Sequence, residues 1–221
     1  MATAGRFGEQ VEGFRIPVLN EREIRGAAGL LFFATFLSLM FIVFAGNFVP
    51  IKFVISAFLA DFVIRVFVSP RFSPTLIVSR WIVRNQVPEY VSAAPKKLAW
   101  MIGIALSSTM FILMVVMNTY SIISGLICLV CLVFLFFESA FGICLGCKMY
   151  SLVYRQQPEL CPGEVCDVKT KHAIQRTSAR QVVALCVFVA GVAAAAFLLG
   201  DTFAERPRPL FGGPTAGQSA N

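Results

Sequence analysis

One stretch of the chain decides its fold class: Cys128-Leu-Val-Cys131-Leu-Val-Phe-Leu-Phe-Phe-Glu138-Ser-Ala-Phe-Gly-Ile-Cys144-Leu-Gly-Cys147. It holds two Cys-x-x-Cys pairs and one carboxylate within a nearly unbroken apolar run. A transmembrane helix needs about 20 mostly apolar residues. The stretch therefore predicts a membrane helix that carries thiols and an acidic side chain.

The chain as a whole is also apolar, with 57% hydrophobic and only 14% charged residues among 221. This composition excludes an ordinary soluble globule. We expect an all-α fold, a polytopic transmembrane helical bundle of four to five spans, the last of which is Ala-rich. The expected spans cover residues 27–46, 50–68, 99–118, 121–143 and 181–200.

The chain divides around these spans into a short arm, a membrane domain and a tail. Residues 1–26 form the arm, 27–200 the transmembrane domain, and the Gly- and Pro-containing residues 201–221 a flexible tail. Within the membrane domain, residues 69–98 and 144–180 are the two longer loops. The first of them contains an amphipathic segment, 73–84, that is typical of a helix lying in the membrane interface.

Basic residues gather in the arm and in both longer loops, which predicts that these segments lie in the cytoplasm. We therefore expect a multi-pass membrane protein with a cytoplasmic N-terminus. The net charge of +7 is explained by this topology and by contact with anionic lipid, so the bilayer is the expected partner and nucleic acid is not.

Three ionisable residues inside the expected spans are candidates for function, because charges in a bilayer are costly: Asp61, Arg65 and Glu138. Arg65 and Glu138 fall at similar depths, which predicts an ion pair, and Asp61 lies one turn from Arg65 at i,i+4. Arg65 would then be the centre of a cluster with two carboxylates. Such a cluster either joins the second and fourth spans or lines a proton or ion path.

The chain has seven cysteines, of which four lie at or beyond the inner end of the fourth span. Cys144 and Cys147 form one pair and Cys161 and Cys166 a second, and they suit two kinds of chemistry. In the first, Cys144 and Cys147 exchange disulfides or carry sulfur, and Glu138 accepts a proton. The second pair then resolves the disulfide or receives the sulfur. In the second, the four thiolates bind zinc.

The other cysteines are weaker candidates for a functional role. Cys128 and Cys131 are expected to pack as small apolar side chains. A direct relay between Cys131 and Cys144 is not expected because thirteen helical residues span roughly 20 Å, so an intermediate carrier would be needed.

Five motifs run through most of the chain: Pro17-Val-Leu-Asn-Glu-Arg-Glu23, Asp61-Phe-Val-Ile-Arg65-Val-Phe, Pro88-Glu-Tyr-Val, Pro95-Lys-Lys-Leu-Ala-Trp100 and Phe137-Glu-Ser-Ala-Phe-Gly-Ile-Cys-Leu-Gly-Cys147-Lys. On these motifs the chain resembles the bacterial integral-membrane family catalogued as domain of unknown function 4395. The resemblance implies a place in the bacterial inner (cytoplasmic) membrane, and sulfur or thiol handling with a thioredoxin-like or rhodanese-like partner. It also marks Asp61, Arg65 and the segment around Cys144 as important.

Three functions remain open. The first is thiol-disulfide exchange or persulfide transfer at the cytoplasmic face, and the second is a permease or ion-handling protein that uses Asp61, Arg65 and Glu138. The third is a structural membrane partner with a zinc clamp at the four cysteines. No haem-attachment motif, phosphate-binding loop or nucleophile elbow is present, so no cofactor other than zinc is expected, and whether the chain is an enzyme stays open.

Overall fold

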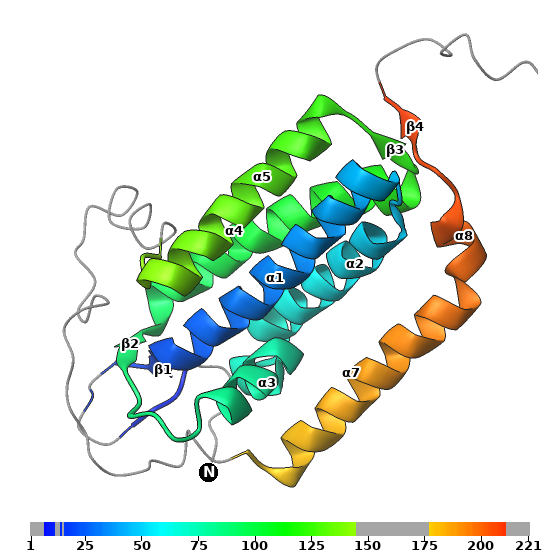
Figure 1. Ribbon diagram of the computed structural model, residues 1–221. Helices are drawn as coiled ribbons and strands as arrows, with labels where there is room; N and C mark the ends of the chain where they lie inside the picture. The colour runs from blue at the N-terminus through cyan, green and yellow to red at the C-terminus, as the bar shows by residue number, and fades with distance from the viewer. Residues whose placement is uncertain (1–6, 12–13, 15, 145–176, 211–221) are drawn as a thin grey trace, which may run out of the picture.

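The computed structural model describes residues 7–11, 14, 16–144 and 177–210, and nearly all of its regular structure is helical (Figure 1). The helices are α1 (Glu21–Ala45), α2 (Val49–Val63), η1 (Ile64–Val68), η2 (Pro70–Phe72), α3 (Pro74–Ile82), α4 (Ala93–Phe111), η3 (Ile112–Val116), α5 (Ile122–Phe136), η4 (Phe137–Phe141), α7 (Ala179–Leu198) and α8 (Gly200–Ala204). The strands in the described residues are short: β1 (Val18–Asn20), β2 (Tyr90–Ser92), β3 (Thr119–Tyr120) and β4 (Arg208–Pro209).

Four helices of the described chain are long and apolar enough to cross a membrane: Glu21–Ala45, Ala93–Val116, Ile122–Phe141 and Ala179–Leu198. A further continuous helix, formed by α2 and the π-helical turn η1, lies alongside α1 and α4 but contains Lys52, Asp61 and Arg65. The prediction of an all-α bundle of four to five spans is confirmed. The chain is a membrane protein.

Two helices begin six residues before the membrane spans that the sequence predicts. α1 starts at Glu21 rather than at residue 27, and Asn20 caps it by accepting a hydrogen bond from the backbone of Arg22. α4 starts at Ala93 rather than at residue 99, which places Lys96 inside its first turns. The apolar pattern misses these turns because several of their charged side chains are buried against one another rather than exposed.

The bundle has two different ends, named here after the short helix found at each. At the α3 end, β1 pairs antiparallel with β2, with Val18 opposite Ser92, and α3 packs against α1. At the α8 end, β3 pairs in parallel with β4, with Thr119 opposite Arg208. α7 runs between the two ends beside α2 and α3, and most of its surface is exposed.

The helix that carries the deciding stretch ends before its second cysteine pair. Gly142 adopts a left-handed backbone with φ of 65°, and its N–H donates to the carbonyl of Glu138. Glycine favours this conformation because it lacks a Cβ. Cys144 therefore follows the helix instead of continuing it, and its side chain turns back into the bundle, where the residue is 3% exposed.

Candidate functional site

Asp61 and Arg65 form a completely buried ion pair on α2 and η1. Arg65 Nη2 lies 2.7 Å from Asp61 Oδ2, as the i,i+4 spacing predicts. Asp61 Oδ1 also accepts hydrogen bonds from Ser73 Oγ at 2.7 Å and from the Thr75 backbone at 3.0 Å, and its Oδ2 accepts from Thr75 Oγ1 at 2.8 Å. The pair thus fixes the residues that begin α3 to the end of α2.

The Arg65 guanidinium is also enclosed by aromatic rings. Its Cζ lies 4.6 Å from the centroid of Phe62 and 5.2 Å from the centroid of Trp100. A cation over aromatic faces is attracted by their quadrupoles, most strongly where water is excluded. Arg65 is therefore held in one position by a carboxylate, two hydroxyl groups and two rings.

The predicted ion pair between Arg65 and Glu138 is not formed. Glu138 instead bonds to Lys96 Nζ, which also lies 2.7 Å from Glu21 Oε2. The early start of α4 explains the difference, because it brings Lys96 between α1 and η4. Lys96, and not Arg65, is the centre of the two-carboxylate cluster, and the Asp61–Arg65 pair joins α2 to α3 rather than the second span to the fourth.

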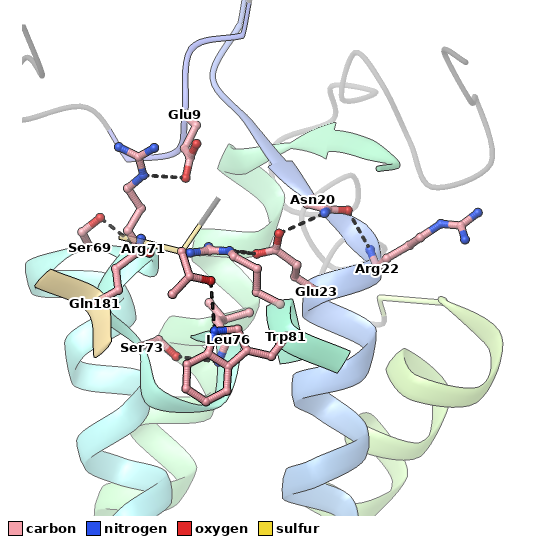
Figure 2. A network of polar contacts seen from close by, with 12 residues as sticks. Glu9, Asn20, Arg22, Glu23, Ser69, Arg71, Ser73, Leu76, Trp81 and Gln181 are labelled. Carbon is pink, nitrogen blue, oxygen red and sulfur yellow. Dashed lines mark hydrogen bonds and ion pairs between the residues drawn. The ribbon is translucent and has the colours of Figure 1, made fainter. Parts of the chain in front are cut away.

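A third buried pair, Glu23 with Arg80, joins α1 to α3. Arg80 Nη2 lies 2.9 Å and Nε 3.0 Å from Glu23 Oε2, while Asn20 Nδ2 donates to Glu23 Oε1 at 3.0 Å (Figure 2). Both side chains of the pair are about as buried as the apolar core around them. Asn20 thereby connects the cap of α1 to the ion pair.

Two further ion pairs lie at the rim of the α3 end, where water has access. Arg22 Nη2 is 2.6 Å from Glu89 Oε1. Arg71 Nε is 2.9 Å from Glu9 Oε1 (Figure 2). Burial raises the pKa of Glu9, and the charge of Arg71 opposes this rise without cancelling it. Burial together with the charges of Glu9 and Glu23 raises the pKa of Tyr90 to about 12.

A partly open cavity lies inside the bundle next to these pairs. Its walls come from α1, α2, α4 and α5 and are mainly apolar. Its charged and sulfur-containing lining residues are Arg65, Lys96, Glu138, Cys131 and Cys144. The fold thus brings two cations, one carboxylate and two thiols from three separate parts of the sequence to one enclosed space.

The cavity involves only part of the predicted thiol site. Cys144 lines it, whereas Cys147, Cys161 and Cys166 lie outside the described residues. Of the four cysteines in the zinc prediction only Cys144 is therefore placed, and both the Cys144–Cys147 pair and the zinc site stay predictions. Cys128 packs in an apolar cluster with Ile51, Ile55, Met110 and Met114.

Sequence reasoning missed four charged residues of this site: Glu21, Glu23, Arg80 and Lys96. It assigned them to the arm and to a loop, because a charged residue next to an apolar run is usually a solvated flank. A signal was present, since Glu21 and Glu23 belong to the motif at 17–23 and Lys96 to the motif at 95–100. These motifs are distant in sequence, yet the fold brings them together with Glu138 at the α3 end.

A known protein family matches the part of the chain that forms this site. The family described as Domain of unknown function (DUF4395) matches residues 19–155, well over half of the chain and every residue that lines the cavity. The chain belongs to this family. No curated protein and no solved structure matches the chain.

Proposed function

We propose that the chain is a membrane thiol-exchange protein in which Cys144 is the reacting thiol. The observation that carries this proposal is the cavity that Cys144 shares with Lys96, Arg65 and Glu138. The nucleophile in thiol exchange is the thiolate, which neighbouring cations favour. Glu138, at 14% side-chain exposure the most accessible acid of the Lys96 cluster, can accept the thiol proton.

The exchange needs a partner that brings a reactive sulfur to the α3 end, and a small thioredoxin-like or rhodanese-like protein has the required chemistry. The Cys144 thiolate attacks the outer sulfur of the partner's disulfide or persulfide. A new S–S bond forms at Cys144, the partner's S–S bond breaks, and the partner's inner sulfur leaves as a thiolate. Cys147 would form the second thiol of the pair, with Cys161 and Cys166 as a receiving pair.

The proposal places the α3 end in the cytoplasm of a bacterium, with the protein in its inner membrane. Basic side chains support this orientation, since the described residues at the α3 end include Arg22, Arg25, Arg71, Arg80 and Arg84. The α8 end has Lys52, Arg206 and Arg208. Basic flanks stay on the cytoplasmic side. Reporter fusions after residues 86 and 206 should report cytoplasm for the first position.

The test uses single-cysteine variants of the full chain in detergent. One variant retains Cys144 and replaces the other six cysteines with serine, and its matched control retains only Cys186, which is exposed on α7 outside the cavity. Both are incubated with glutathione disulfide, and mixed disulfide is followed by intact mass. We expect Cys144 to react at least about tenfold faster than Cys186, because cations stabilise its thiolate.

The reaction of Cys144 should also depend on its neighbours. Glu138→Gln should slow the exchange and change its pH profile, whereas Lys97→Met, a change at an exposed residue beside Lys96, should do neither. Equal rates for Cys144 and Cys186 would refute the proposal. One zinc per unmodified chain, lost when Cys144 is replaced, would favour the zinc clamp instead.

A further inference from the structure

We infer that an open pocket at the α3 end binds the phosphate group of an anionic phospholipid. The pocket shares none of its described lining residues with the cavity at Cys144, and its role is independent of the proposed thiol exchange. Three segments of the chain supply its lining, which includes Arg22, Arg25 and Gly26 on α1, Gln86 and Glu89 after α3, and Ser139 on η4.

Two glycines let α3 and η4 pack closely against α1 beside the pocket. A Cβ on Gly26 would lie 2.2 Å from Ser79 Oγ, and a Cβ on Gly29 would lie 2.8 Å from Ser139 Oγ. A larger residue at either position would force its neighbours to move. The pocket has a volume of about 360 Å³, against about 70 Å³ for the cavity at Cys144. Sites for small molecules generally enclose about 300–1,000 Å³, so this pocket has room for a lipid head group.

Arg25 gives the pocket a positive charge that forms no ion pair within the described chain. Its Nε and Nη2 donate to the carbonyl oxygens of Ser139 and Ala140, at 3.4 and 3.2 Å, and these bonds hold the guanidinium at the end of η4. Its Nη1 has no acceptor among the described residues. Arg22, by contrast, is paired with Glu89. Two arginines and one glutamate leave the described lining with one net positive charge, which attracts an anion.

A phosphate diester suits the charge and the donors of this pocket. Guanidinium N–H groups match the geometry of phosphate oxygens and form strong, charge-assisted hydrogen bonds with them. Arg22 and Arg25 are three residues apart on α1, so both lie on one face of the helix. A diester carries a single negative charge, which balances the net charge of the described lining. Basic pockets between membrane helices are typical sites for phosphate-bearing head groups.

The surroundings of the pocket favour a lipid over a free phosphate ion. Exposed apolar side chains begin beside it, because Trp81 and Ile82 at the end of α3 are 43% and 62% exposed. On α1, Phe33 lies two turns from Gly26 on the same face and is 61% exposed. Tryptophan is typical of the head-group level of a bilayer, and α1 is long and apolar enough to cross it. A lipid can therefore place its phosphate in the pocket and its acyl chains along this apolar surface.

The test is a titration of the full chain, in a nonionic detergent, with dioleoyl phosphatidylglycerol. Native mass spectrometry counts the bound lipids and gives the Kd of the first one. Dioleoyl phosphatidylcholine has the same acyl chains and a phosphate but no net charge, and it serves as the lipid control. We expect the first phosphatidylglycerol to bind at least about fivefold more tightly than phosphatidylcholine. Millimolar inorganic phosphate should not displace it.

Two pairs of variants separate the pocket from the basic surface around it. Arg25→Gln removes the unpaired charge, whereas Arg84→Gln removes an exposed charge outside the described lining. Gln86→Glu adds a carboxylate to the lining, whereas Asn85→Asp adds one at the exposed residue next to it. We expect the Kd for phosphatidylglycerol to rise at least about fivefold with Arg25→Gln and with Gln86→Glu, and to change less than about twofold with the two controls.

Equal changes in Kd within both pairs would overturn the site, because charge would then act over the whole surface. Equal affinity for the two lipids would overturn it as well, and displacement by inorganic phosphate would assign the pocket to a free phosphate ion instead. If Arg25→Gln does not fold, the Gln86→Glu and Asn85→Asp pair decides alone, since it leaves the bonds of Arg25 in place. Cys144→Ser should retain lipid binding, so the lipid site and the proposed thiol exchange can fail separately.

Discussion

The two ends of the bundle bury a lysine in opposite ways. At the α3 end, Lys96 lies between the carboxylates of Glu21 and Glu138. At the α8 end, Lys52 Nζ donates to Asn118 Oδ1 at 2.8 Å and to the carbonyl oxygen of Glu205 at 2.7 Å. Both lysines are 1% exposed, so burial alone does not distinguish them. The difference lies in their partners, which are charged at one end and formally neutral at the other.

The contrast shows what each end is built to do. The α3 end combines three buried sets of ion pairs around the cavity, and they join α1, α2, α3, α4 and η4 to one another. At the α8 end, Lys52 donates hydrogen bonds both to the turn after η3 and to the residues that follow α8, and so connects these two segments. Buried charges add little net stability to a fold but cost much when one partner is lost. Their concentration at one end favours a role for them there beyond holding helices together.

The largest expected effect comes from Lys96→Met. The substitution leaves Glu21 and Glu138 facing one another in the interior without their shared cation. Removing one partner of a buried ion pair typically costs about 3–5 kcal/mol in the free energy of unfolding. Thermal unfolding in detergent, followed by circular dichroism, should show a correspondingly large fall in Tm.

The neighbouring residue provides the control for this experiment. Lys97→Met removes the same charge from the same helix, but Lys97 is exposed and contacts only the ring of Phe7 among the interactions described. We expect a change below about 1 kcal/mol. Adding Glu138→Gln to Lys96→Met should restore part of the lost stability. Equal losses in the two lysine variants would show that the α3 end does not depend on its charge pairs.

Lys52→Met should have a smaller effect at the opposite end. It removes two hydrogen bonds to oxygens that are not formally charged, which typically costs about 1–3 kcal/mol when the acceptors are left unpaired. The loss should be local, so amide hydrogen exchange should accelerate in residues 199–210 and not in α1 or α4. A loss as large as that of Lys96→Met, or faster exchange spread across the bundle, would show that the two ends are energetically alike.

Much of the site could be predicted where the relevant spacing lies within one helix. The Asp61–Arg65 pair follows from an i,i+4 interval, and the membrane helices follow from length and apolarity. The membership in the family likewise rests on motifs that are visible in the sequence.

The partner of Glu138 could not be predicted in the same way, because it depends on where α4 begins. Equal depth in the membrane made Arg65 a reasonable partner, but depth does not fix the rotation of one helix about its axis relative to another. Lys96 enters the bundle only because its charge is matched by Glu21 and Glu138, a condition that belongs to the packed state. From the sequence alone, Lys96 is interpreted as a residue that flanks a membrane span.

The smallest expected effect on stability comes from Glu9→Gln, at the rim of the α3 end. Burial raises the pKa of Glu9, so the folded protein binds this proton more tightly than the unfolded chain does. Glu9 therefore contributes stability that is present at low pH and is lost as the pH rises through its raised pKa. Compared with the parent chain, the Glu9→Gln variant should be relatively less stable at about pH 4 than at about pH 8. The difference should stay below about 1 kcal/mol, because the charge of Arg71 offsets part of the effect of burial on Glu9.

The measurement is Tm at both pH values for the parent chain, for Glu9→Gln and for Arg71→Gln. Removing the Arg71 cation leaves the burial of Glu9 unopposed, so Arg71→Gln should steepen the pH dependence that Glu9→Gln removes. The reverse sign, with the parent chain gaining stability over Glu9→Gln as the pH rises, would mean that the Arg71 charge outweighs burial at Glu9. The rim would then depend on its ion pairs as the interior does, and the division between interior and rim at the α3 end would fail.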